Sequence, residues 1–158
     1  MNIYLRIFGV GPTGFLISAL LLLITFLLED GLAHLQISSN ELLRWSIFVG
    51  LCVVTGLIML WSVISLPITK RGKRLVTSGA FRYFRHPLYG ACLSFFNFGL
   101  AIFLNNWIYI LWAVVQHPVW HWLIRHEEKL MEQRFPSEYE AYASKTGRFF
   151  PRLFQQNK

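Results

Sequence analysis

Charged residues are scarce in this chain and are absent from long parts of it. Asp, Glu, Lys and Arg together make up 15% of the 158 residues, whereas hydrophobic residues make up 54%. None of these four charged types occurs in residues 8–28, 45–66 or 87–124. A helix rises about 1.5 Å per residue, so about 20 such residues cross a hydrocarbon core of roughly 30 Å. The scarcity of charge therefore excludes an ordinary soluble domain and predicts an integral membrane protein.

Cysteine is also rare. The two cysteines, Cys52 and Cys92, fall inside hydrophobic stretches and have neither a metal-ligand spacing nor the density of a disulfide framework. No internal repeat or low-complexity segment is present, and 158 residues leave room for one membrane domain. We therefore treat residues 1–158 as a single domain.

The charge-free stretches predict an all-α fold with four transmembrane helices. The last stretch is too long for one span, and Asn105-Asn106 divides it in a way that is typical of a tight turn between antiparallel helices. The predicted spans are 8–28, 45–66, 88–104 and 106–124.

The distribution of Lys and Arg predicts the orientation. Residues 67–87 contain six of them and the tail from Arg125 contains seven, whereas 29–44 contains only Arg44. By the positive-inside rule, both termini and the 67–87 loop face the cytoplasm, across the inner membrane if the source is bacterial. The net charge of +7 then follows from topology and from attraction to anionic lipid headgroups, and it needs no nucleic acid.

Two polar segments flank the last hydrophobic stretch and carry an ordered set of motifs. They read Leu75-Val76-Thr77-Ser78-Gly79, then Arg85-His86-Pro87-Leu88-Tyr89, then Glu127-Glu128, then Phe135, Tyr139 and Tyr142, and finally Arg148 and Pro151. Over residues 67–152 this order resembles the isoprenylcysteine carboxyl methyltransferase and phospholipid methyltransferase superfamily of membrane enzymes. The chain departs from the family pattern at Pro136-Ser137, where a Gly is usual, and at Phe81, where a Tyr is common.

The resemblance implies S-adenosylmethionine as cofactor, bound by elements at about 73–90 and 125–152, with the C-terminal helix and tail closing the pocket. The residues that it implies for cofactor binding are Val76, Gly79, Tyr83, Arg85, His86, Tyr89, Glu128, Tyr139 and Tyr142. An arginine fork suits a carboxylate such as that of the cofactor. For catalysis we expect Glu127 to position or deprotonate the acceptor, and Arg125 and Arg148 to anchor anionic groups.

Helical periodicity places His117, His121 and Glu128 on one stripe of the fourth helix, with Glu127 about 100° away. Histidines at i and i+4 are also a metal-ligand spacing, but no third ligand at a convincing spacing accompanies them. Metal or haem ligation, a polar lining of a substrate tunnel and structural hydrogen bonding remain open for these histidines.

The predicted function is methyl transfer from S-adenosylmethionine to a lipophilic acceptor at the cytoplasmic face of the membrane. The acceptor classes that remain open are a prenylcysteine-like carboxylate, an aminophospholipid and a thiol. The alternatives are an NADPH-dependent sterol-type membrane reductase and a small haem- or metal-binding membrane protein. The oligomeric state stays open.

Overall fold

The structure is a computed structural model that describes residues 9–31, 34–66 and 74–152. Within these ranges the chain forms helices and no extended sheet, and its one bridge pairs Phe84 with Gly147. The elements are α2 (Gly11–Glu29), α3 (Glu41–Ser65), the 3₁₀ turn η2 (Gly79–Arg82), α4 (Pro87–Ala91), the π-helical η3 (Cys92–Phe96), α5 (Asn97–Leu104), α6 (Trp107–Arg134) and α7 (Pro136–Lys145).

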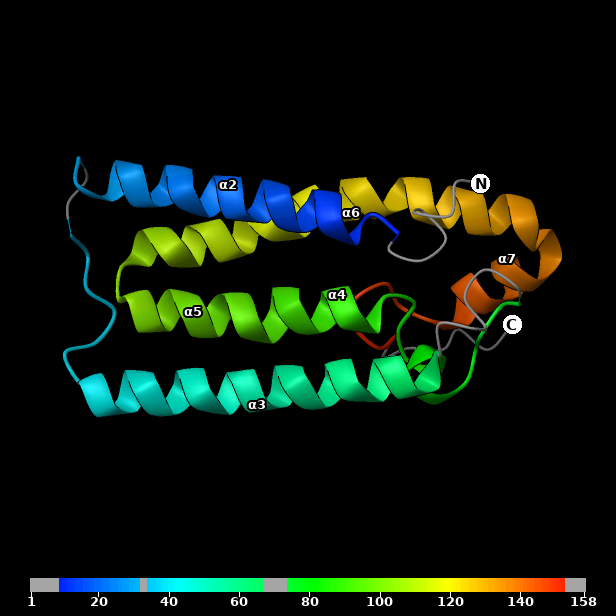
Figure 1. Cartoon of the computed structure of the whole chain (residues 1–158), viewed down its shortest axis with the longest axis horizontal. Coiled ribbons are helices and arrows are strands. Elements are labelled where there is room, and N and C mark those ends of the chain that lie inside the picture. Colours follow the sequence, from blue (N-terminus) through cyan, green and yellow to red (C-terminus); the bar gives the residue numbers. More distant parts are fainter. Residues whose placement is uncertain (1–8, 32–33, 67–73, 153–158) are drawn as a thin grey trace.

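The long helices of the described chain lie side by side as rods (Figure 1). One rod is the continuous run of α4, η3 and α5, which packs against α3 on one side and joins α6 through a tight turn. The helix α2 packs against α6. The Asn105-Asn106 turn was predicted and is confirmed: Asn105 is left-handed, with φ of 61°, and the side chain of Asn106 caps α6 at the Ile108 amide.

Among the described residues, three helical runs are long and apolar enough to cross a membrane, namely Gly11–Glu29, Glu41–Ser65 and Pro87–Leu104. The predicted third span agrees closely with its helix. The second begins four residues earlier than predicted, because Asn40 caps it through the Leu43 amide and Glu41 lies in its first turn. The fourth predicted span, 106–124, lies in α6, which is less apolar and continues to Arg134, so this span stays a prediction.

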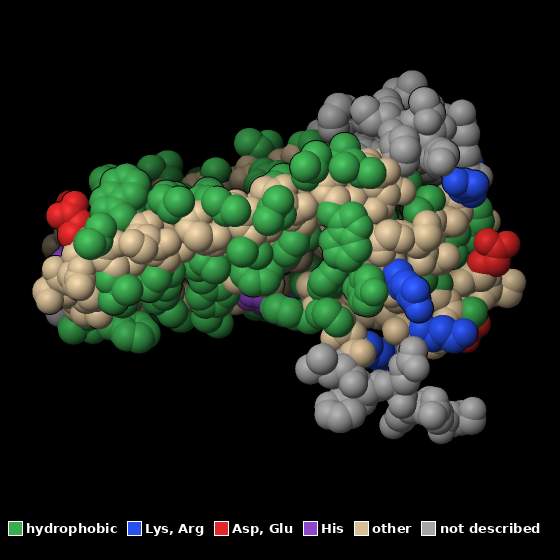
Figure 2. Space-filling model, turned by 90° about the horizontal axis from the view of Figure 1, so that it is seen from below, with side chains coloured by type: hydrophobic (Ala, Val, Ile, Leu, Met, Phe, Trp, Pro, Cys, Tyr) green, Lys and Arg blue, Asp and Glu red, His purple; other side chains and the backbone are tan. Residues whose placement is uncertain are grey.

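Apolar side chains cover the long body of the molecule, and Lys and Arg gather at one end of it (Figure 2). We call this end, which carries residues 79–87 and 134–152, the site end. The opposite end, with residues 34–40 and the Asn105-Asn106 turn, is the loop end. There Glu29 accepts hydrogen bonds from Tyr109 at 2.5 Å and from Asn106 at 2.9 Å, which ties α2 to α6.

The predicted cytoplasmic location of both termini lies outside the described residues, as does the basic stretch 67–73. Several described segments that adjoin the predicted cytoplasmic face do lie at the same end of the molecule. The start of α2, the end of α3, the start of α4 and all of α7 lie at the site end (Figure 1).

Candidate functional site

The two polar segments predicted to converge do so through backbone pairing. Phe84 and Gly147 form an isolated parallel bridge. The Arg85 amide donates to the Gly147 carbonyl at 2.8 Å, and the His86 amide donates to the Arg148 carbonyl at 3.0 Å. Pro87 then begins α4, where its missing N–H costs no helical hydrogen bond. The segment before α4 and the tail after α7 are thereby fixed in register.

Two glycines make this close pairing possible. A Cβ atom on Gly90 would lie 2.7 Å from the Phe149 carbonyl oxygen, and one on Gly147 would overlap the Phe150 carbonyl. Both clashes are with backbone, which cannot move aside as a flexible side chain can. A side chain at Gly90 would push the tail off α4, and one at Gly147 would disrupt the turn that the tail makes within itself.

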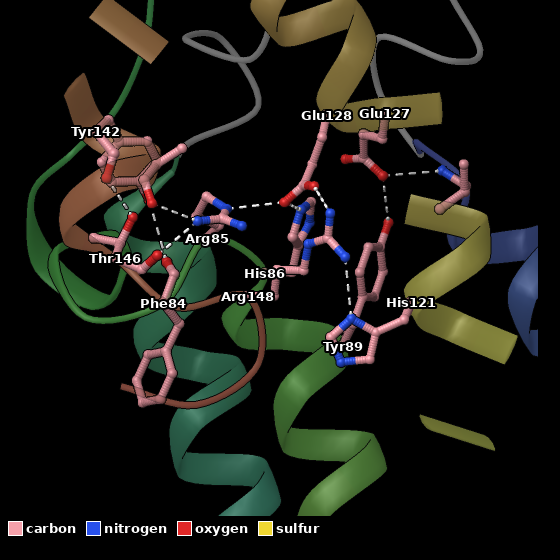
Figure 3. A network of polar contacts seen from close by, with 12 residues as sticks. Phe84, Arg85, His86, Tyr89, His121, Glu127, Glu128, Tyr142, Thr146 and Arg148 are labelled. Atoms are coloured by element: carbon pink, nitrogen blue, oxygen red, sulfur yellow. Dashed lines mark hydrogen bonds and ion pairs between the residues drawn. The ribbon is translucent and has the colours of Figure 1, made fainter. Parts of the chain in front are cut away.

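Glu128 is the centre of a buried ionic cluster. Only 9% of the residue is exposed, and its carboxylate lies 2.8 Å from Arg85 Nε and 2.7 Å from Arg148 Nη2 (Figure 3). Nε2 of His86 lies 3.5 Å away. Burial raises the pKa of the Glu128 carboxyl, but the neighbouring His86 and Arg85 lower it more, to about 2. Glu128 is therefore an ionised structural anchor at neutral pH and a poor proton acceptor.

Arg85 is held by groups from two elements. Besides the contact with Glu128 on α6, its Nη1 donates to the carbonyls of Ala143 at 2.9 Å and of Thr146 at 2.6 Å, at the end of α7. These carbonyls lack helical partners because the helix stops there. The guanidinium thus links α4, α6 and α7, with charge-assisted hydrogen bonds that are stronger than neutral ones.

Glu127 has different partners from its neighbour Glu128 (Figure 3). Its Oε2 lies 3.5 Å from the Tyr89 hydroxyl and 3.4 Å from the Val10 amide nitrogen. The residue is half-buried, and in the described part of the chain it forms no ion pair. The two adjacent glutamates therefore differ in kind: Glu128 is neutralised by cations, whereas Glu127 accepts from neutral donors.

A groove of about 570 Å³ lies beside the cluster at the site end. Residues from both predicted cofactor elements line it, including Leu75, Thr77 and Arg82 from one and Glu138, Tyr142 and Lys145 from the other. The Tyr142 hydroxyl donates to the Phe81 carbonyl at 2.7 Å and so joins the two walls. Burial raises the pKa of Tyr142 to about 12 and also raises the pKa of Tyr139, so both phenols stay protonated.

Comparison of the sequence with known protein families finds a match that covers most of this region. The sequence profile described as phospholipid methyltransferase matches residues 43–138, well over half of the chain. The chain belongs to the phospholipid methyltransferase family. The matched residues include Arg85, His86, Tyr89 and both glutamates, and they stop before Arg148.

One relative of this phospholipid methyltransferase family member is an uncharacterised protein of Schizosaccharomyces pombe. It is 36% identical over 88 residues, which cover 52% of this chain and 25% of that protein. The chain thus spans about a quarter of the length of that relative. No solved structure matches the chain.

The predicted site residues of this family member fall into two groups. Arg85, His86, Tyr89, Glu127, Glu128 and Arg148 come together, with Tyr139 and Tyr142 buried behind them. Val76 is half-buried between the groove residues Leu75 and Thr77. The remaining three, Gly79, Tyr83 and Arg125, have other surroundings. Tyr83 is 48% exposed and packs on Trp61, Arg125 is exposed on α6, and Gly79 adopts a positive φ of 62° beside Ser65.

Sequence reasoning missed the groove residues Arg82, Lys145 and Thr77, and it missed Val10. Arg82 was counted only among the basic residues of the 67–87 loop, whose charge the positive-inside rule accounts for without a binding role. The spacing of Arg82 three residues before Arg85 was the available signal. No signal in the sequence linked Val10 to Glu127, because 117 positions separate them.

The predicted stripe of α6 is confirmed for His121 and Glu128, which both contact Arg148. His121 Nδ1 lies 3.3 Å from Arg148 Nη1. His117 instead stacks on Phe150, with ring centroids 6.0 Å apart and planes 16° apart. Among the described residues, no group of three potential ligands surrounds these histidines. Both histidines pack against aromatic rings of the tail.

Proposed function

We propose that this phospholipid methyltransferase family member transfers a methyl group from S-adenosylmethionine to a lipophilic acceptor that reaches the site from the bilayer. The observation that carries the proposal is the buried cluster of Arg85, His86, Glu128 and Arg148 at the polar end of an apolar helical bundle. Buried charges that converge from three segments are costly unless they serve a site. Family membership supplies the reaction class.

The groove fits the chemistry of the cofactor. Its volume of about 570 Å³ lies within the range of about 300–1,000 Å³ that is typical of small-molecule sites. Arg82 and Lys145 offer cations for a carboxylate, Glu138 offers an anion for an ammonium group, and Leu75 with Tyr142 offers apolar surface for a flat base. We propose these residues, rather than Arg85 alone, as the ones that hold S-adenosylmethionine.

When bound, S-adenosylmethionine supplies a methyl group activated by a sulfonium, so that the carbon–sulfur bond breaks as the acceptor forms its new bond to carbon. The protein then needs chiefly to align the acceptor and exclude water. Glu127 is the residue that we place at the acceptor. It would orient any acceptor, and it would accept the proton that an ammonium headgroup must lose.

Arg85, Glu128 and Arg148 have a positioning role in this proposal. They hold the tail against α4 and so keep bulk water from the acceptor side of the site. Arg148 is 30% exposed at its side chain, which makes it the member of the cluster best placed to contact an anionic group as well. Arg125 is exposed and is assigned to headgroup contact.

The membrane arrangement completes the proposal. We place residues 107–124 of α6 in the bilayer as a fourth span, with the remainder of α6 in the cytoplasm. Both walls of the groove then lie on the cytoplasmic face, as the charge bias of the sequence requires. Residues Gln116, His117 and His121 would face the bundle interior, where polar groups in membrane spans are usually found.

Cofactor binding is the first test. Calorimetry in detergent with S-adenosylmethionine, S-adenosylhomocysteine and NADPH should detect binding of the first two ligands only. Binding of NADPH alone would refute methyl transfer and favour a reductase.

Substitution of Glu127 tests its role. With a panel of prenylated thiols, aminophospholipids and small thiols as acceptors, Glu127→Gln should lower turnover by roughly 10²–10⁴-fold, which is typical for loss of a general base. Affinity for S-adenosylhomocysteine should change little. The control is Glu132→Gln, an exposed position further along α6. Full activity of Glu127→Gln on the best acceptor would remove it from the catalytic step.

A further inference from the structure

The beginning of α2 lies directly against the side chains of the candidate active site. The Val10 amide donates to Glu127 Oε2 at 3.4 Å. A Cβ atom on Gly9 would lie 2.8 Å from the same carboxylate oxygen, and one on Gly11 would lie 3.3 Å from the Tyr89 hydroxyl. A Cβ atom on Gly14 would lie 2.5 Å from the ring of Trp120. Gly9 and Gly11 thus face the site side chains Glu127 and Tyr89, and Gly14 faces Trp120.

These glycines allow the start of α2 to pack closely against the side chains of α4 and α6, which a residue with a Cβ atom would prevent. Gly9 also adopts a positive φ of 59°, a backbone conformation that residues with a Cβ atom rarely adopt. Trp120 is almost fully buried and packs on Tyr89 with ring centroids 4.8 Å apart. Any residue larger than glycine at 14 would move Trp120, and Trp120 would move Tyr89.

A polar chain further along α2 fixes its register on α6. The indole nitrogen of Trp120 donates to the Ser18 hydroxyl at 2.9 Å, and this hydroxyl donates to Gln116 Oε1 at 2.8 Å. Gln116 is fully buried. These polar groups have few alternative partners in an apolar interior. They therefore fix the position of α2 along the axis of α6. The Val10 amide is thereby held opposite Glu127.

We propose that the segment Gly9–Gly14 is a positioning element of the active site, which aims the carboxylate of Glu127. Both hydrogen bonds that the described residues donate to this carboxylate go to Oε2. Gly9 packs against both carboxylate oxygens, since a Cβ atom there would lie 2.8 Å from Oε2 and 2.9 Å from Oε1. The family match begins at residue 43, so this assignment rests on the contacts of this chain and on the function proposed above.

A double-mutant cycle tests the proposal where activity is measurable. Gly9→Ala should lower kcat by roughly tenfold to a hundredfold, the cost of a small misplacement, while affinity for S-adenosylhomocysteine stays unchanged. In a Glu127→Gln background, Gly9→Ala should have no further effect on kcat, because its effect passes through the carboxylate. Gly50→Ala is the matched control, since a Cβ atom there meets nothing within 4 Å. Equal losses in both backgrounds would overturn the proposal.

A cross-linking experiment tests the contact without any need for activity. In a Cys52→Ala, Cys92→Ala background, Gly9→Cys with Glu127→Cys should form a disulfide on mild oxidation, seen by mass spectrometry. The pair Gly31→Cys with Glu127→Cys should not, because Gly31 lies at the loop end. Failure of the first pair in folded protein refutes the positioning element. If this pair cross-links but wild-type protein methylates no acceptor of the panel, the proposed function alone is refuted.

Discussion

Replacing Glu128 by glutamine should detach the C-terminal tail from α4. The substitution keeps the size of the side chain but removes the charge that Arg85 and Arg148 share. It leaves two guanidinium groups close together with no anion between them. Glu132→Gln, one turn further along α6 and exposed, is the matched control.

The magnitude follows from the pKa of Glu128. A carboxyl whose pKa falls from 4.5 to about 2 on folding stabilises the folded state by about 3 kcal/mol at neutral pH, at about 1.36 kcal/mol per pH unit. This agrees with the roughly 3–5 kcal/mol that breaking a buried ion pair costs. The partial exposure of Arg148 places the effect at the lower end.

Hydrogen exchange of the Arg85 and His86 amides is the assay of choice. Both amides donate to tail carbonyls, so their protection reports attachment of the tail. A loss of about 3 kcal/mol predicts roughly hundredfold faster exchange in Glu128→Gln, measured by mass spectrometry of the peptide that contains them. Glu132→Gln should exchange like the wild type.

The same carboxyl predicts an acid dependence with a definite sign. Because its pKa is lowered in the folded protein, the stabilisation is complete above pH 4.5 and is lost as pH falls from 4.5 toward 2. The melting temperature of the wild-type protein should fall as the pH is lowered from 4.5 toward 2. The part of this fall that is due to Glu128 should be absent from Glu128→Gln. Unchanged exchange together with an unchanged acid profile would refute the anchoring role of Glu128.

Three further predictions concern the groove, the tail and the topology. Tyr142→Phe removes the hydrogen bonds to the Phe81 and Phe84 carbonyls, which should cost about 1–3 kcal/mol in thermal denaturation and weaken S-adenosylhomocysteine binding in calorimetry. Gly147→Ala should open the turn of the tail and expose it to limited proteolysis, because its Cβ atom would overlap the Phe150 carbonyl; intact protection would contradict this tight turn. With an impermeant maleimide applied to intact cells, Ser39→Cys should be labelled and Ser144→Cys should not, and the reverse pattern would invert the proposed orientation.

Much of the fold could be predicted because lipid imposes a simple rule on sequence. Apolar runs located the helices, and Asn105-Asn106 located the turn, since asparagine tolerates the left-handed conformation found there. The start of α3 was misplaced because a cap such as Asn40 lies outside the apolar run that marks the span. The extent of α6 beyond the span depends on packing of its polar face, which hydropathy does not record.

The sequence predicted most of the residues of the candidate site, but few of the contacts that these residues make. Periodicity alone separated Glu127 from Glu128, because adjacent helical residues point about 100° apart. It did not indicate that Arg85 would donate to the carbonyls at Ala143 and Thr146, since backbone groups have no signature in a sequence. The contact of Val10 with Glu127 is likewise a product of tertiary packing.

The order in which the chain is synthesised determines when Arg85 can make its contacts. Arg85 is made before every group that neutralises or hydrogen-bonds it, because Glu128, Ala143 and Thr146 all follow it in the chain. While the third helix enters the membrane, its guanidinium must be solvated by water and headgroups. The tail can dock only after α6 and α7 have been made, and a chain halted before Thr146 would lack one of the two carbonyls that accept from Arg85 Nη1.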